Sequence, residues 1–93
     1  MSVRLIIQNE QGSISSEKCF PSSLTFAVLK ERLENIFGFS SLQMNIWHFD
    51  EKDRLIQQFI GNTSSTDSHS LAQLGFQNYH LVKVKQNDLF EGQ

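Results

Sequence analysis

Branched apolar residues open the chain in a pattern that is typical of extended structure. They occupy every position of 3–7 except Arg4, polar residues follow at 9–12, and a second extended stretch runs over 14–20. Branched side chains fit a pleated surface, and Asn and Gly next to them supply turn geometry. The pattern therefore predicts a β-hairpin that ends at Pro21.

After Pro21 the hydrophobic period changes from extended to helical spacing. Five apolar side chains recur at spacings of 3, 4, 3 and 1, namely Phe26, Leu29, Leu33, Ile36 and Phe37. These positions share one face of an α-helix. Thr25 can cap the first turn with its hydroxyl, and Gly38 can end the helix in a left-handed conformation. The sequence therefore predicts an amphipathic helix between these two residues.

The second half of the chain combines short extended runs with polar connections. In order, the pattern predicts a strand at 42–49, a charged turn at 50–53, a strand at 54–59, a solvated mobile loop at 61–68, a helical turn at 70–76 and a strand at 80–85. The loop contains no apolar residue, so its composition cannot offset the entropy lost on ordering.

This order of elements predicts an α+β fold of the β-grasp type. A mixed sheet of four to five strands packs on one amphipathic helix, and the crossover through the helix lets the third strand lie parallel to the first. The predicted core is apolar throughout and consists of Leu5, Ile7, Phe20, Phe26, Leu29, Leu33, Met44, Ile46, Leu71, Leu74, Phe76, Val82 and Val84.

Length and composition narrow the class of protein. The chain has 93 residues, a formal net charge of −2 and a single cysteine. We expect one domain at residues 1–85, with 86–93 as a tail or linker toward a downstream domain. The acidic balance argues against nucleic acid as a partner, and no apolar run approaches the ~18–20 residues of a membrane span. The lone Cys19 excludes a disulfide framework and fits a reducing cytosol.

Few side chains offer nucleophile or metal-ligand chemistry. They are Cys19, His48, His69 and His80, and no pair has the spacing of a zinc site. The glycines are scattered and form no phosphate-binding loop. We therefore expect no metal, no cofactor, no catalytic residue and no enzymatic activity. A Cys19-dependent enzyme is the alternative, which an unreactive thiol would exclude.

Apolar residues on the outer face of the predicted sheet offer a protein-binding site instead. If Leu5, Met44 and Val82 and their alternate neighbours face the helix, then Ile6, Trp47 and Leu81 face away from it. Their strands are neighbours in a β-grasp sheet, so the three side chains form one exposed patch, rimmed by Arg4 and Lys83. Trp and Arg are frequent at binding hot spots. The alternative is that Trp47 lies flat on the sheet as ordinary surface.

Two motifs around the predicted helix indicate a family. Residues 16–25 form Ser-Glu-Lys-x-(aromatic)-x-x-Ser-Leu-Thr, and residues 29–34 form Leu-Lys-x-(Arg/Lys)-Leu-Glu ahead of Gly38. Over residues 3–85 the chain resembles the N-terminal ubiquitin-like domains of the tubulin-folding cofactor B family. The chain departs from that family at Trp47, where we expect a polar residue, and it lacks the Gly-Gly terminus that conjugation needs.

The resemblance implies a chaperone role through protein contacts. Members of this family are cytosolic, microtubule-associated factors that bind α-tubulin and act with cofactor E in tubulin heterodimer assembly and disassembly. A CAP-Gly domain follows the ubiquitin-like domain in that family. For this chain the resemblance implies α-tubulin and cofactor E as partners and a location in the cytoplasm at the microtubule cytoskeleton. We expect a monomer.

Two other functions remain open for the same fold. One is PB1-type self-association, in which Arg4 of one copy meets the acidic turn of Asp50, Glu51 and Asp53 on the next. The other is a generic ubiquitin-like docking domain without a link to tubulin. A monomer in sedimentation at low salt would exclude the first.

Overall fold

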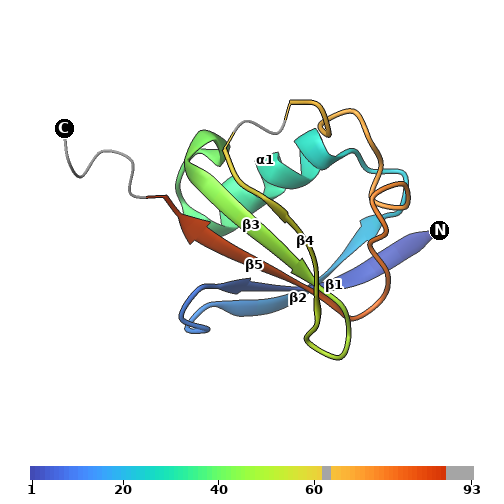
Figure 1. The fold of residues 1–93 in the computed structure, drawn as a ribbon, viewed down its shortest axis with the longest axis horizontal. Coiled ribbons are helices and arrows are strands. Elements are labelled where there is room, and N and C mark those ends of the chain that lie inside the picture. Colours follow the sequence, from blue (N-terminus) through green and yellow to red (C-terminus); the bar gives the residue numbers. More distant parts are fainter. Residues whose placement is uncertain (62–63, 88–93) are drawn as a thin grey trace.

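Five strands and one α-helix form the described part of the chain, residues 1–61 and 64–87 of a computed structural model. The elements are β1 (Ser2–Asn9), β2 (Ser15–Pro21), α1 (Phe26–Phe37), a 3₁₀ turn η1 (Ser41–Gln43), β3 (Met44–Phe49), β4 (Leu55–Phe59) and β5 (His80–Gln86). The helix crosses one face of the sheet, as Figure 1 shows. The predicted β-grasp fold is confirmed.

The strand order corrects one topological prediction. The sheet runs β2-β1-β5-β3-β4, and its only parallel pair among the described strands is β1 with β5. The last strand, rather than the third, therefore lies parallel to the first. The reason is that the long connection after β4 inserts β5 into the middle of the sheet, where it separates β1 from β3 (Figure 1).

The helix has the caps that the sequence predicts. The Thr25 hydroxyl accepts a hydrogen bond from the Val28 N–H at 3.4 Å. At the other end Gly38 has a φ of 84°, and its N–H donates to the Glu34 carbonyl at 2.8 Å. A residue with a Cβ is strained at this φ, so glycine is the residue that ends the helix without cost.

The core lies between α1 and the sheet, and it matches the prediction with three changes. Val3 and Phe59 join it, while Leu74 is only partly buried. Phe59 packs its ring 4.3 Å from that of Phe26 on the helix. This contact places the end of β4 beneath α1. Because it is a tertiary contact, spacing along the strand does not predict that Phe59 is buried.

The connection from β4 to β5 differs from the predicted solvated loop. Residues 62 and 63 lie outside the described part, but Asp67 is half-buried and forms an ion pair with Lys30 at 2.7 Å. The carbonyls of Asp67 and His69 accept hydrogen bonds from the N–H groups of Ala27 and Phe26. The connection thus satisfies donors that the first turn of a helix leaves free.

The predicted helical turn at 70–76 and the predicted tail complete the chain. The Leu74 N–H donates to the Ser70 carbonyl at 3.0 Å, and Gly75 has a φ of 86°, so one turn forms and ends as predicted. β5 extends through Gln86, one residue into the predicted tail; residues 88–93 lie outside the described part. No described helix is long and apolar enough to cross a membrane.

Candidate functional site

The sheet face opposite α1, hereafter the open face, brings the predicted site residues together. Ile6 on β1 pairs with Leu81 on β5, and Lys83 on β5 pairs with Trp47 on β3. Arg4 lies two positions before Ile6 and therefore on the same face. We call these five residues the open-face patch. Their predicted proximity is confirmed; their role in binding stays a prediction.

Trp47 does not pack beneath the helix. Its side chain is half-buried, and the indole Nε1–H donates to Oε1 of Gln58 at 3.1 Å. Gln58 is the direct partner of Trp47 on β4, so the indole is tied across two strands of the open face. This hydrogen bond orients a large aromatic surface on a rigid sheet.

The open-face patch is less exposed than the sequence predicted. Ile6, Trp47 and Leu81 are all half-buried, because neighbouring strands place a side chain on either side of each. Phe49 adds to the apolar surface, since it pairs with Leu81 on the same face. Alternation along 42–49 could have included Phe49, because it lies two residues beyond Trp47.

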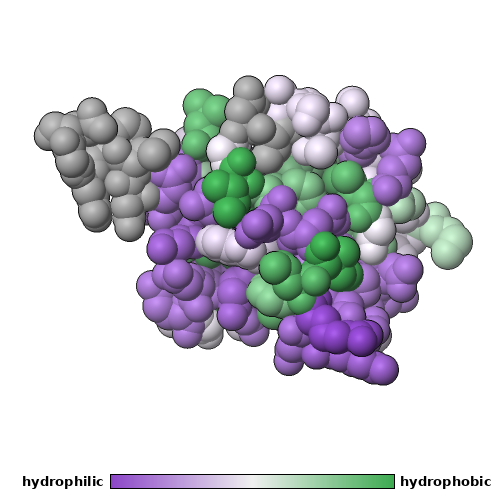
Figure 2. Space-filling model, viewed as in Figure 1, coloured by the Kyte–Doolittle hydropathy of each residue, from purple (hydrophilic) through white to green (hydrophobic). Residues whose placement is uncertain are grey.

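The most exposed apolar side chains of the sheet lie on its edge strand β4 instead. Leu55 and Ile56 are 53% and 46% exposed, and Ile60 just beyond the strand is 54% exposed. In Figure 2 apolar surface interrupts the hydrophilic surface along the path of β4. The sequence did not predict this exposure, because an edge strand lacks a neighbour on one side and the sequence does not identify the edge.

The charges of the open face are partly neutralised within the chain. Arg4 Nη1 lies 3.0 Å from Glu17 Oε2, and this hydrogen bond raises the pKa of the guanidinium above its ordinary value. Lys85 forms an ion pair with Glu10 at 3.4 Å. The Lys83 ammonium lies 5.8 Å from the centroid of the Phe49 ring and forms no ion pair with any described carboxylate.

A buried pair of histidines lies on the covered side of the sheet. His48 Nε2 and His80 Nδ1 are 2.7 Å apart, and the two side chains are 0% and 4% exposed. Burial, followed by the charge of His80, lowers the pKa of His48 to about 4. His48 is therefore neutral at pH 7. Both residues attract attention in the sequence only for nucleophile or metal-ligand chemistry, but strand alternation places His48 on the same face as Met44 and Ile46 and so already indicates burial.

The hydrogen-bond partners of the two histidines determine which ring nitrogen donates and which accepts. The Gln57 amide donates to the Leu74 carbonyl at 2.7 Å and to His48 Nδ1 at 2.9 Å. His48 must then carry its proton on Nε2 and donate to His80 Nδ1, which leaves the His80 Nε2–H facing Glu51 Oε2 at 3.4 Å. The relay joins β3, β4 and β5 and satisfies polar atoms inside the core, so its role is structural.

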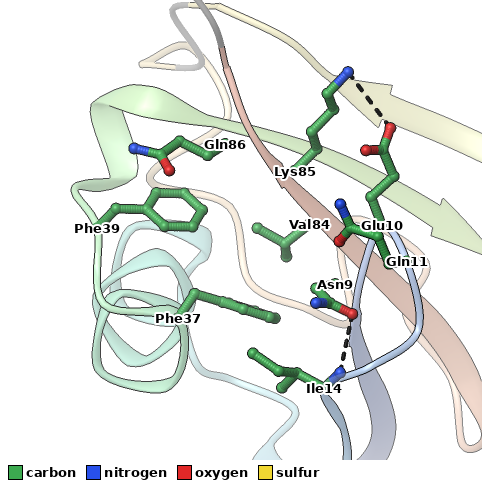
Figure 3. A pocket seen from close by; sticks show the side chains of 9 residues that line it. All are labelled: Asn9, Glu10, Gln11, Ile14, Phe37, Phe39, Val84, Lys85 and Gln86. Atoms are coloured by element: carbon green, nitrogen blue, oxygen red, sulfur yellow. Dashed lines mark hydrogen bonds and ion pairs between the residues drawn. The ribbon is translucent and has the colours of Figure 1, made fainter.

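A pocket of about 460 Å³ lies at the end of the domain away from this relay. In Figure 3 the rings of Phe37 and Phe39 and the side chain of Ile14 line it, with the Glu10–Lys85 ion pair at its edge. Amide side chains of Asn9, Gln11 and Gln86 also contribute to the lining.

The residues that PB1-type self-association or a Cys19-dependent enzyme would use either have partners within the chain or lie apart from one another. Arg4 pairs with Glu17, Asp50 with Arg54 at 3.0 Å, and Glu51 faces His80, so PB1-type pairing would have to break contacts within the chain. Cys19 is exposed on β2 opposite Arg4, with no contact to the His48–His80 pair. Within residues 1–61 and 64–87 no three potential metal ligands cluster.

Comparisons with known proteins agree with the fold. A sequence profile described as a ubiquitin-like domain matches residues 2–90. A solved ubiquitin-like domain from tubulin-binding cofactor B has a TM-score of 0.78 at 24% identity, with 91% of this chain and 89% of that chain covered. Tubulin-binding cofactor B of Trypanosoma brucei has a TM-score of 0.78 at 14% identity, with 92% and 95% covered.

A second tubulin cofactor has a similar domain. The C-terminal ubiquitin-like domain of mouse tubulin-specific chaperone e has a TM-score of 0.74 at 18% identity, and the match covers 94% of this chain and 88% of that chain. No curated protein matches the sequence. The family resemblance noted in the sequence is thus accompanied by structural likeness.

Proposed function

The chain belongs to the ubiquitin-like domain family, and from that premise we propose that it is a non-catalytic protein-interaction module of a tubulin-folding cofactor. It binds α-tubulin or cofactor E and assists assembly and disassembly of the tubulin heterodimer. It acts in the cytoplasm at microtubules, as a monomer. We place the module at residues 1–85.

Two independent features support a tubulin-related role. The motifs at residues 16–25 and 29–34 resemble those of cofactor B, and the fold is similar to domains of both cofactor B and chaperone e. The sequence motifs and the structural likeness both support this proposal. A β-grasp fold alone would not distinguish this role, because one fold serves many functions.

The open-face patch is the observation that carries a binding role. It places an indole and two aliphatic side chains on three adjacent strands, beside cations at Arg4 and Lys83. Rigid aromatic side chains lose little entropy on binding and dominate the energetics of many interfaces. The patch is therefore suited to protein recognition.

Binding of purified αβ-tubulin, and separately of cofactor E, tests this function. We expect Trp47→Ala to weaken the Kd for at least one partner by about tenfold or more, as for an aromatic hot spot. Leu42→Ala is the control, since Leu42 is 87% exposed and lies in η1, outside the open face. Absence of binding to both partners would contradict the proposal; an equal loss in both variants would contradict the assigned surface.

A further inference from the structure

Lys83 occupies the middle of the open face, and none of its neighbours among the described residues is acidic. Its direct partners are Gln8 on β1 and Trp47 on β3, and both are uncharged. The side chain is half-buried among them, and its ammonium lies 5.8 Å from the Phe49 ring. A cation beside an aromatic ring is attracted to it, but the ring does not replace a carboxylate.

The other two cations of the open face, Arg4 and Lys85, differ from Lys83 because each has a carboxylate partner within the chain. Arg4 is paired with Glu17 at 3.0 Å and Lys85 with Glu10 at 3.4 Å. No described carboxylate lies within ion-pair distance of Lys83. The uncompensated positive charge of the face is therefore in its centre, next to its most apolar surface.

From this juxtaposition we infer that the open face recognises a protein segment that presents a carboxylate to Lys83 and apolar side chains to Trp47 and Leu81. Charge complementarity selects an acidic segment, because a basic one would place a second cation beside the Lys83 ammonium, which no described carboxylate neutralises. When apolar side chains cover Trp47, water leaves the site and the ion pair becomes shorter and stronger.

Other anionic partners fit less well. A nucleic-acid backbone requires several cations in a row, whereas the other cations here are already paired and the chain has a net charge of −2. The inference rests on the proposed function, because it names the chemistry of the partner at the same surface.

The test is binding of αβ-tubulin and of cofactor E to the wild-type chain and to variants at one position. We expect Lys83→Met, which keeps the aliphatic stem, to weaken the Kd by about fivefold to thirtyfold and to reduce its dependence on salt. Lys83→Glu should weaken binding further, and Lys83→Arg should retain most of it.

Lys18→Met is the matched control, since Lys18 pairs with the core residue Leu5 and so belongs to the opposite face of the sheet. We expect its Kd to equal that of the wild type, and thermal unfolding to confirm that every variant is folded. If Trp47→Ala weakens binding but Lys83→Met and Lys83→Glu do not, the carboxylate inference is wrong while the proposed function stands. If the wild type binds neither partner, both are wrong.

Discussion

The two faces of the sheet use the same strands in different ways. On β1, Leu5 and Ile7 are 0% exposed beneath α1, whereas Ile6 between them is half-buried on the open face. On β5, Val82 is fully buried and its neighbour Leu81 is not. Neighbouring apolar residues thus differ in burial because only one face has a covering layer. Hydrophobicity alone does not distinguish a core position from a binding position.

Polar groups also differ between the covered face and the open face of the sheet. On the covered face His48 and His80 are buried; His48 forms hydrogen bonds with Gln57 and His80, and His80 Nε2 lies 3.4 Å from Glu51. On the open face the ion pairs are exposed, and Lys83 has no described carboxylate partner. A buried polar group must find a partner within the fold, while a surface group can leave this contact to another protein.

The largest expected effect is on the covered face. Leu5→Ala removes a fully buried side chain and leaves a cavity, so we expect the free energy of unfolding to fall by about 2–5 kcal/mol. Urea denaturation monitored by circular dichroism measures this change. A loss below 1 kcal/mol, on the scale expected for a surface site, would show that the two faces do not differ as described.

The next effect is pH dependence from the buried relay. The pKa of His48 is lowered to about 4 in the folded chain, so the unfolded chain binds more protons between pH 6.5 and 4. The stability that comes from neutral His48 is therefore complete above pH 6.5 and decreases as the pH falls. We expect a loss of about 2 kcal/mol between pH 7.5 and 5.

Urea denaturation between pH 7.5 and 5 measures this loss in the free energy of unfolding. His48→Gln is the control, and it should make the free energy of unfolding less dependent on pH in that range. The lowered pKa values of Glu34 and Asp50 act at lower pH, because stability from a carboxylate is lost only as the pH falls through its folded pKa. An equal slope with and without His48 would assign the pH dependence to other groups.

A smaller effect is expected where the covering helix ends. Gly38→Ala places a Cβ at a φ of 84°, with no atom within 4 Å to clash, so only backbone strain opposes it. We expect a loss of about 1 kcal/mol, measured by urea denaturation. The Trp47 indole resonance should not move, since the open face is not involved. A shift of that resonance would mean that the faces are coupled.

The smallest effect on stability is expected on the open face. Leu81→Ala removes the same atoms as Leu5→Ala, but from a half-buried position without a covering layer. We expect the free energy of unfolding to fall by less than about 1 kcal/mol, because the site stays open to water. Equal losses for the two variants, measured side by side, would remove the distinction between core and binding surface.

Local features of the fold were predictable from the sequence. The helix from Thr25 to Gly38 has its own caps and apolar stripe, and alternation assigned Ile6, Trp47 and Leu81 to one face. These features depend on neighbours within a few residues. They therefore follow from composition and spacing.

Features that depend on distant contacts were not predictable. The parallel pairing of β1 with β5 joins residues far apart in the sequence, and the connection after β4 docks on α1 through Asp67 and His69. The direction of the His48–His80 relay is set by Gln57, which contacts both a ring nitrogen and the Leu74 carbonyl. The exposure of β4 depends on its place at the edge. Spacing along the chain carries none of this information.

The central claim is that the open face, and not the rest of the surface, meets the partner. Trp47 is the single tryptophan of the chain, so a deuterated, ¹⁵N-labelled sample has one indole N–H signal within the open-face patch. Cross-saturation from unlabelled αβ-tubulin or cofactor E should reduce this signal and the amide signals of Ile6, Leu81 and Lys83 more than that of Leu42. Saturation centred on Leu42 or α1, with the indole signal unchanged, would contradict the claim.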